Sequence, residues 1–174
     1  MIISIEDVKK YLTTDEPDAV LESKLQALEL LIRKYTNNNF QNRAIRTKCP
    51  VLSQKLYTDY PLFQVGDTIQ ISQSEFNDGI YVIENIDNHF VELNKTLIDE
   101  SDVMITKVEY PIDVVMGVVN MLKWDIQNRD TVGIQSETIS RHSVTYFNMD
   151  GDNSAMGYPK SLLSFLNVYK KARF

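Results

Sequence analysis

The chain has 174 residues and is acidic, with a formal net charge of −6 and a pI of about 4.9. This balance argues against a dedicated nucleic-acid-binding protein, because such a protein normally presents a basic surface to the phosphates. Hydrophobic residues make up 43% of the chain, which excludes global disorder and predicts a packed core in one ordinary domain or two small ones.

No membrane segment or secretory leader is expected. The longest apolar run, from Val114 to Val119, is far too short to span a bilayer. The first seven residues lack the basic region and long apolar run of a signal peptide.

The first forty residues predict two helices. Ser4 to Asp7 has the form of a capping box, so a short helix is expected to about Leu12. Pro17 suits the first position of a second helix, because its missing N–H is not needed there. Three asparagines from residue 37 are expected to end that helix, since Asn tolerates the left-handed conformation. Its apolar stripe, in steps of three and four, consists of Leu21, Leu25, Leu28, Ile32 and Tyr35.

Between Arg43 and Tyr110 the apolar period changes from 3.6 to 2, which predicts short strands. Turn signals at Asn77–Gly79 and Asp87–Asn88 separate them. The strands are expected at 68–72, 79–86, 89–93 and 102–108. Short strands at this spacing predict a small barrel or twisted sheet, and Val65–Ile69 followed by Gly79–Ile83 resembles SH3-like barrels.

Helical spacing returns at Pro111, and a last helix is expected from Pro159. Gly117 lies inside the third helix, where it costs about 1 kcal/mol relative to Ala, so we expect a neighbouring helix to approach closely there. The expected stripe of the third helix is Ile112, Val115, Val119, Leu122 and Ile126, widened by Met116, Val118 and Trp124. The expected inward residues of the last helix are Leu162, Leu163, Leu166 and Tyr169.

The stretch from Gly133 to Tyr146 joins these two helices. Gly133 interrupts the helical pattern, after which polar and apolar residues alternate, and Ser143 to Phe147 is β-branched and aromatic. This pattern predicts a short extended arm or hairpin between helices. A polar loop is expected from Met149 to Met156.

Three features together resemble the head–tail connector proteins of tailed bacteriophages, also called adaptor or head-completion proteins. They are a helix opening at Tyr110-Pro111, the motif Gly-Ile-x-Ser-Glu-x-Ile-x-x-x-Ser-Val-Thr-Tyr from Gly133, and a last helix that opens at Tyr158-Pro159 and ends in Tyr169–Phe174. The resemblance implies an α+β fold: a small helical bundle core of the connector type, residues 1–43 and 110–174, with a β domain inserted at 44–109. Insertion between neighbouring chain ends has a small entropic cost.

The resemblance also implies a structural virion protein rather than an enzyme, with no cofactor. It would form a cyclic ring of about twelve copies that docks under the portal protein, extends the DNA channel and carries the stopper or tail-completion protein. DNA would pass through the ring without specific binding, which suits an acidic wall. The expected location is the virion neck, after synthesis in the bacterial cytoplasm.

The resemblance assigns two sets of contact residues. Those expected to dock on the portal are Tyr169, Lys170, Lys171, Arg173 and Phe174. Those expected to contact a neighbouring subunit or the stopper are Ile134, Ser136, Glu137, Ile139, Arg141, Val144 and Tyr146. From charge alone, the terminal cations would simply complement the C-terminal end of a helix.

No motif for catalysis or metal binding stands out. Cys49 is expected to be a half-buried strand thiol, and the two histidines, His89 and His142, lack metal-ligand or catalytic spacing. A calcium loop starting at Asn148 would need Gly at 153 and Glu at 159, where the chain has Asn153 and Pro159, so an acidic turn is expected there.

A second hypothesis treats the chain as a binding module, in which an SH3-like β domain recognises a peptide or a nucleic acid. A basic face on that domain would favour nucleic acid. Residues 44–109 contain no clustered Lys/Arg run, which argues against it.

Overall fold

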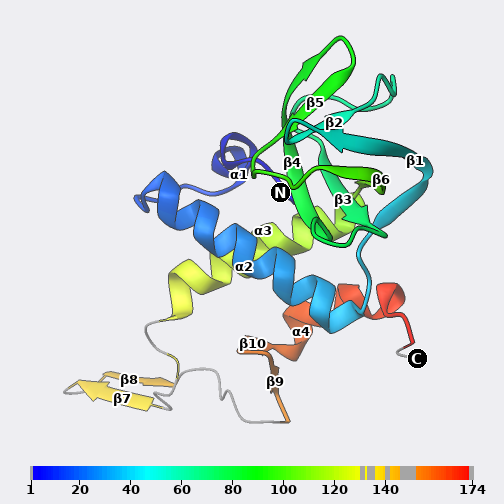
Figure 1. Ribbon diagram of the computed structural model, residues 1–174. Coiled ribbons are helices and arrows are strands. Elements are labelled where there is room, and N and C mark those ends of the chain that lie inside the picture. Colours follow the sequence, from blue (N-terminus) through cyan, green and yellow to red (C-terminus); the bar gives the residue numbers. More distant parts are fainter. Residues whose placement is uncertain (1, 130–131, 133–135, 140–141, 146–151, 173–174) are drawn as a thin grey trace. The chain divides into compact units, whose positions relative to one another are not determined.

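The computed structural model describes residues 2–129, 132, 136–139, 142–145 and 152–172 (Figure 1). The fold is mixed α and β, with a closed six-stranded antiparallel barrel and four α-helices. The chain forms two compact units: a barrel unit, residues 39–110, and a helical unit, residues 2–38 and 111–172. No described helix has the length and apolarity needed to cross a bilayer.

Six strands form the barrel, in the order β1-β2-β5-β4-β3-β6, and antiparallel pairing of β1 with β6 closes it. Four of these strands confirm the predicted ones to within two residues at each end. The first two were not predicted individually. The strands are β1 (Gln41–Leu52), β2 (Lys55–Tyr57), β3 (Thr68–Ser72), β4 (Gly79–Asp87), β5 (Phe90–Leu93) and β6 (Glu100–Val108).

One apolar cluster fills the barrel. Ile69, Ile71 and Ile105 are fully buried, and Cys49 lies among them with 4% of its surface exposed. Cys49 is therefore a strand thiol as predicted, but fully rather than half buried. Burial raises the pKa of its thiol to about 12, with a smaller contribution from Asp102.

The chain enters and leaves the barrel at neighbouring points. Gln41 of β1 lies opposite Val108 of β6, and the Glu109 amide donates to the Phe40 carbonyl at 3.0 Å. The rings of Phe40 and Tyr110 pack with centroids 4.9 Å apart. The two connections are thus held side by side.

The helical unit begins with α1 (Ile5–Tyr11) and α2 (Asp18–Thr36). Ser4 caps α1 as predicted, its hydroxyl accepting from the Asp7 amide at 3.1 Å. Asn37 ends α2 in the left-handed conformation, with φ of 50°. The predicted stripe of α2 is confirmed, since Leu21, Leu25, Leu28 and Ile32 are buried and Tyr35 is half-buried.

The stripe predicted for α3 (Ile112–Asn128) is partly wrong. Ile112 is 74% exposed, and Val115 and Ile126 are only half-buried. Because apolar residues lie on nearly every side of this helix, spacing alone could not identify the buried face. That face consists of Val114, Gly117, Val118, Val119, Met121, Leu122 and Asp125.

Gly117 allows the close approach that the sequence predicted. A Cβ atom at Gly117 would lie 2.1 Å from Cζ of Phe165, so the aromatic ring occupies the space that a side chain would fill. The contact is made by a ring from the C-terminal segment, rather than by the backbone of another α-helix.

The last helix is shorter than predicted. Here α4 (Lys160–Leu163) continues as a 3₁₀ helix from Ser164 to Tyr169. Leu163 and Leu166 are buried as expected, whereas Leu162 and Tyr169 are half-buried. Just before it, β9 (Ser154–Ala155) and β10 (Tyr158–Pro159) form a tight hairpin in a region predicted to be a polar loop up to Met156.

Candidate functional site

The predicted arm contains a hairpin. Strand β7 (Ser136–Ile139) pairs antiparallel with β8 (His142–Thr145), which places Ser136 opposite Thr145. This confirms extended structure in the arm. Of the residues assigned to the arm, Ser136, Glu137, Ile139 and Val144 lie on these strands, whereas Ile134, Arg141 and Tyr146 lie outside the described residues.

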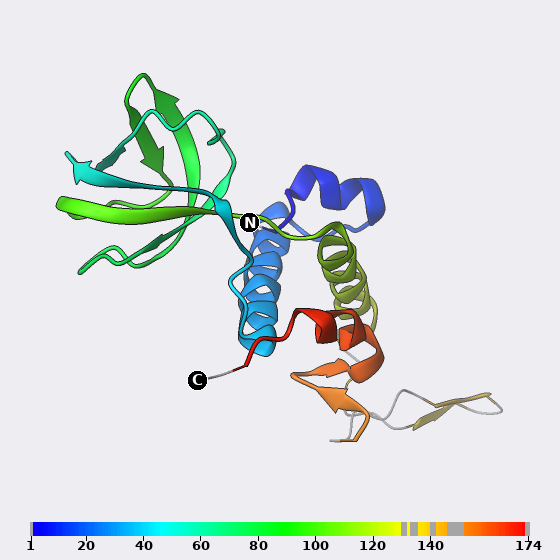
Figure 2. The ribbon, with the colours of Figure 1, turned by 90° about the vertical axis from the view of Figure 1, so that its right-hand side faces the viewer.

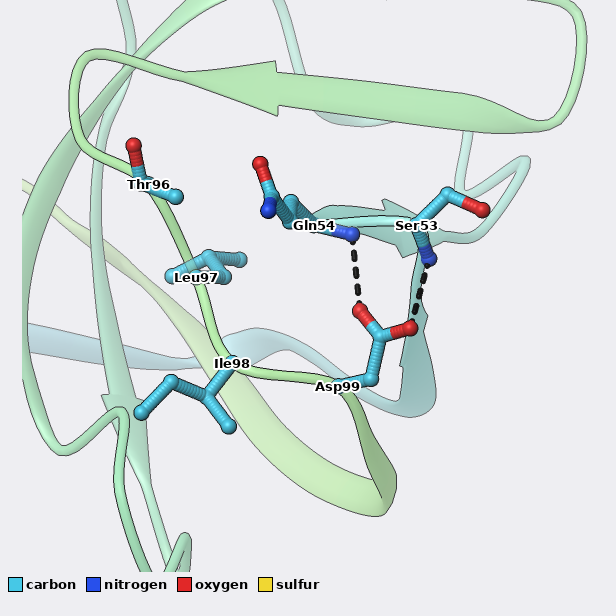
Figure 3. A pocket seen from close by; sticks show the side chains of 6 residues that line it. All are labelled: Ser53, Gln54, Thr96, Leu97, Ile98 and Asp99. Carbon is cyan, nitrogen blue, oxygen red and sulfur yellow. Dashed lines mark hydrogen bonds between the residues drawn. The ribbon is translucent and has the colours of Figure 1, made fainter.

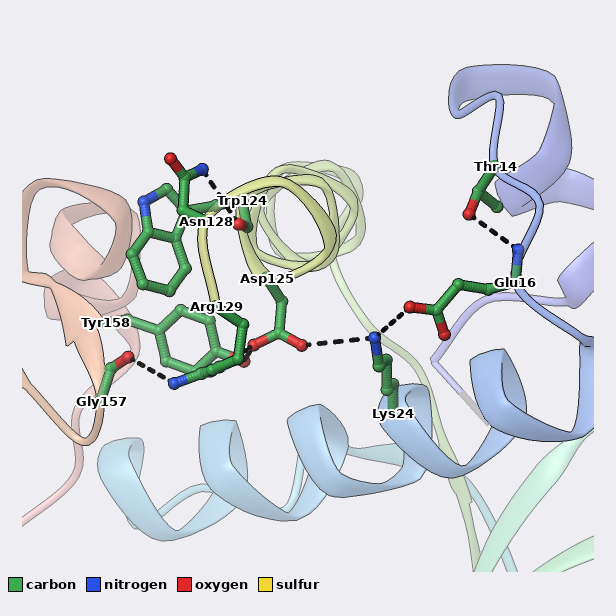
Figure 4. Close-up of polar contacts among 9 residues, drawn as sticks. All are labelled: Thr14, Glu16, Lys24, Trp124, Asp125, Asn128, Arg129, Gly157 and Tyr158. Carbon is green, nitrogen blue, oxygen red and sulfur yellow. Dashed lines mark hydrogen bonds and ion pairs between the residues drawn. The ribbon is translucent and has the colours of Figure 1, made fainter. Parts of the chain in front are cut away.

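Described residues on either side of the arm are hydrogen-bonded to each other in the helical unit. The chain leaves α3 at Arg129, whose Nη1 donates to the carbonyl of Gly157 at 3.2 Å, 28 residues further along. The Tyr158 hydroxyl donates to Asp125 at 3.2 Å. We name Trp124, Asp125, Arg129 and Tyr158 the arm root (Figure 4).

Charge and aromatic packing act together in the arm root. Arg129 donates to Asp125 from Nε at 2.6 Å and also from Nη2, and its guanidinium carbon lies 4.9 Å from the Tyr158 ring centroid. The same group lies 5.4 Å from the Trp124 ring, and the two rings pack with centroids 5.4 Å apart. Such charge-assisted bonds and cation–π contacts are the stronger polar interactions in proteins.

The carboxylate of Asp125 is the buried centre of this group. Burial first, and then the negative charge of Asp125, raise the pKa of Tyr158 to about 12. Tyr158 is therefore a neutral hydrogen-bond donor at physiological pH. On its other side, Asp125 faces the Lys24 ammonium at 3.8 Å, and Lys24 also pairs with Glu16 at 2.6 Å (Figure 4).

The arm root thus connects α2, α3 and the β9–β10 hairpin. Lys160 extends the connection, since its amide donates to the Asn153 carbonyl at 2.9 Å and its Nζ donates to the Asp152 carbonyl at 2.6 Å. The polar groups serve each other as donors and acceptors, so the arrangement joins the end of α3 to the β9–β10 hairpin.

The predicted portal-docking residues Tyr169, Lys170 and Lys171 lie against the C-terminal end of α2 and the start of α3. The Tyr169 hydroxyl bonds to both carboxylate oxygens of Asp113 at 2.8 Å. The Lys170 ammonium lies 4.1 Å from the Tyr35 ring centroid and donates to the Tyr35 hydroxyl at 3.0 Å. Arg173 and Phe174 lie outside the described residues.

Backbone hydrogen bonds hold the same segment. The Lys171 amide donates to the Thr36 carbonyl at 2.8 Å, and the side chains of Asn37 and Asn38 donate to the carbonyls of Ala172 and Tyr169. The C-terminal segment therefore supplies a donor to the Thr36 carbonyl at the end of α2, where a helix has no donor of its own to offer. The ammonium of Lys170 lies against Tyr35 in the last turn of α2, where a cation complements the helix dipole.

Side chains of the types that ligate metals do not gather into a site among the described residues. No group of three His, Cys, Asp or Glu side chains there is placed to hold a metal ion. His89 is exposed, with Nδ1 at 3.9 Å from Asp59. Asn148 to Asp150 lie outside the described part of the chain.

A shallow pocket lies at one end of the barrel, lined by Ser53, Gln54 and Thr96–Asp99 (Figure 3). Asp99 accepts from the amides of Ser53 at 3.0 Å and Gln54 at 2.8 Å. Both donors have positive φ, 51° and 65°, as in the tight hairpin turns that join antiparallel strands. Asp99 thereby orders the β1–β2 turn.

Comparison of the sequence with protein-family models finds no match, and comparison with curated proteins finds none either. The arm root was missed by the sequence analysis. Its only local signal is the spacing of four between Asp125 and Arg129, which suits a helical ion pair. The contacts to Gly157 and Tyr158 span about thirty residues, so spacing in the sequence could not reveal them.

Proposed function

We propose that the chain is a structural subunit of a phage neck, a ring-forming head–tail connector that docks under the portal, extends the DNA channel and carries the stopper. The proposal rests on the sequence resemblance. One observation in the structure supports it most: a hairpin in the arm, which lies in the chain between Arg129 and Gly157, two residues that are hydrogen-bonded to each other. An arm held in this way can offer backbone hydrogen bonds to a neighbouring subunit without a large apolar patch.

The C-terminal segment bears on how portal docking should be tested. Removing residues 169–174 would also remove the contacts to Asp113, Tyr35 and Thr36, so a truncated protein would lose stability as well as docking. Lys171 is the better site, because it is exposed and the fold uses its backbone amide rather than its ammonium.

We expect Lys171→Glu to weaken co-sedimentation with purified portal rings roughly tenfold, with little change in thermal unfolding. Lys123→Glu, an equal charge reversal at an exposed position of α3, is the matched control. Equal binding by Lys171→Glu and the parent would remove Lys171 from the docking residues. Failure of the parent itself to bind portal rings would contradict the proposed function.

The mode of assembly is tested by electron microscopy of the protein with its portal. Copies that contact each other head to tail, through two different surfaces, should close into a ring, and this ring should stack coaxially on the portal. A closed two-fold dimer that does not bind the portal would contradict a connector role.

The second candidate function, a binding module, is favoured by one feature of the barrel. Its closed sheet has no free edge, yet several large apolar side chains at its loops are exposed, including Phe76 and Ile98. Peptide binding through those loops is compatible with a place in a virion neck.

A further inference from the structure

Three loops gather at one end of the barrel. This is the end opposite the paired Gln41 and Val108, where Val51 of β1 lies opposite Glu100 of β6. The loops are the β1–β2 turn at 52–54, the β3–β4 loop at 73–78 and the segment 94–99 before β6. Figure 2 shows this end of the barrel on the left of the view.

Hydrogen bonds connect the three loops. Asp99 accepts from the amides of Ser53 and Gln54, as described above. The side chain of Asn77, 3% exposed, donates to the Ile98 carbonyl and accepts from the Ile98 amide, both at 2.8 Å. A binding surface built on these loops is therefore largely ordered before a partner arrives, which lowers the entropic cost of binding.

Glu100 strengthens the same arrangement from the start of β6. Its carboxylate accepts from the Ser74 hydroxyl, from the Asn77 side chain and from the Glu75 amide, the last at 2.7 Å. These bonds, the one from Ser74 first, hold the pKa of Glu100 below its usual range. Glu100 therefore stays ionised at neutral pH.

Each loop presents a large apolar side chain to solvent. Leu52 is 44% exposed, Phe76 is 58% exposed and Ile98 is 55% exposed. Leu52 precedes Ser53 and Phe76 precedes Asn77. Ile98 binds Asn77 through its own backbone and precedes Asp99, which accepts from Ser53. We name Leu52, Phe76 and Ile98 the loop surface. Exposed aromatic and aliphatic side chains on loops that are hydrogen-bonded to one another are typical of the apolar centre of an interface.

Charge around the loop surface is predominantly negative. The three loops and the first residue of β6 contain four carboxylates, Glu75, Asp78, Asp99 and Glu100, and one cation, Lys95. A metal ion does not account for these carboxylates, because no three of them come together as ligands within the described residues. Nucleic acid is disfavoured by the same charge.

We propose that the loop surface binds a segment of a partner protein in which Lys or Arg residues are interleaved with apolar ones. Leu52, Phe76 and Ile98 would bury the apolar side chains, and the surrounding carboxylates would attract the cations and speed association. The proposal goes beyond the connector function and concerns the barrel alone, so it holds whether or not the helical unit docks on a portal.

The test uses the full chain as the target for a random peptide library, with the enriched peptides synthesised and measured by calorimetry. We expect peptides that carry both Lys or Arg and large apolar residues. The double variant Phe76→Ser, Ile98→Ser should weaken their binding by at least about tenfold. Val65→Ser is the matched control, since Val65 is 62% exposed in another loop of the barrel, and it should leave the affinity unchanged.

A second variant tests the charge without touching the apolar side chains. Glu75→Lys replaces an exposed carboxylate. Glu75 orders the loop through its backbone amide, which donates to Glu100, and the substitution keeps that amide. It should weaken binding several-fold, with most of the loss disappearing at high salt. This variant keeps the test valid if the double variant does not fold.

Several outcomes would overturn the proposal, and four of them concern the peptides and variants. They are a library that yields no peptide above background, enriched peptides without cations, equal binding by the parent and the double variant, and binding lost in Val65→Ser instead. Self-association of the parent that disappears in the double variant would assign the surface to a second copy of the chain, which also overturns it.

Discussion

The barrel unit and the helical unit are each stabilised by a different set of internal interactions. In the barrel, strands from one continuous stretch of chain enclose a single apolar cluster, with a ladder that closes on itself through β1 and β6. The helical unit is assembled from two distant stretches, and polar contacts such as Asp125–Arg129–Tyr158 and Tyr169–Asp113 join its parts. Both units should therefore lose stability when buried volume is removed, and the helical unit also depends on polar contacts that join its two stretches of chain.

The chain offers a direct way to follow the two units separately. Trp124 is the only tryptophan and belongs to the helical unit, so its fluorescence reports on that unit. The circular dichroism of the strands reports on the barrel.

The largest effect is expected in the barrel core. Ile71→Ala removes a fully buried side chain and should lower the stability of the barrel by about 2–5 kcal/mol, because a cavity remains. The Trp124 transition should not move. Leu25→Ala, in the buried face of α2, should shift the Trp124 transition and leave the unfolding of the barrel unchanged. If Ile71→Ala shifts both transitions equally, the two units unfold as one.

The next largest effect is expected at the arm root. Asp125→Ala leaves Arg129, Tyr158 and Lys24 without their shared acceptor and should lower the stability of the helical unit by about 2–3 kcal/mol. The measurement is denaturant unfolding followed by Trp124 fluorescence. In the barrel, the Lys48 ammonium forms a half-exposed ion pair with the Asp102 carboxylate at 2.9 Å. Lys48→Ala breaks this pair and should lower the stability of the barrel by about 0.5 kcal/mol or less. Equal losses of stability in Asp125→Ala and Lys48→Ala would show that polar contacts matter no more in the helical unit than in the barrel unit.

Much of this architecture was accessible from the sequence, for physical reasons. Ser4 and Asn37 act through their immediate neighbours, and the alternation at 68–72 reflects a strand buried on one side, so local patterns were sufficient. The first strand was missed because Arg43, Arg46 and Lys48 of β1 are exposed, and only its last residues, near Val51, enter the core.

The candidate site was less accessible. The face of α3 depends on which neighbours pack against it, and its many apolar residues fit several faces equally well. The place of the C-terminal segment depends on bonds to α2 more than 130 residues away, such as Lys170 to Tyr35. Contacts of this range leave no periodic pattern in the sequence.

As the pH rises into the alkaline range, the barrel unit should lose stability before the helical unit does. The pKa of Cys49 rises from 9.0 to about 12 on folding, so its contribution is complete below pH 9 and is lost as pH rises towards 12. The pKa of Tyr158 rises from 10.0 to about 12 on folding, so its contribution to stability is complete below pH 10 and is lost as the pH rises towards 12. The barrel should therefore weaken first, by up to ~1.4 kcal/mol per pH unit. Cys49→Ala should abolish the decline of the barrel between pH 9 and 10, and Tyr158→Phe should leave that decline in place.

The smallest effect is expected at the C-terminal segment. Tyr169→Phe removes the hydroxyl that donates to Asp113 and should lower the stability of the helical unit by about 1 kcal/mol, because the ring stays in place. Thermal unfolding by Trp124 fluorescence is the measurement. Tyr57→Phe, an exposed tyrosine of the barrel, serves as control and should change neither signal. No loss in Tyr169→Phe would show that backbone bonds alone hold the segment.

The side-by-side entry and exit of the barrel, at Phe40 and Glu109, has a consequence for inheritance and engineering. A segment whose two ends already meet can be gained, lost or exchanged by recombination as one cassette, without redirecting the chain on either side. The same geometry makes this junction a natural splice site, where an affinity tag or a reporter domain with adjacent termini could replace the barrel while α2 and α3 keep their sequence.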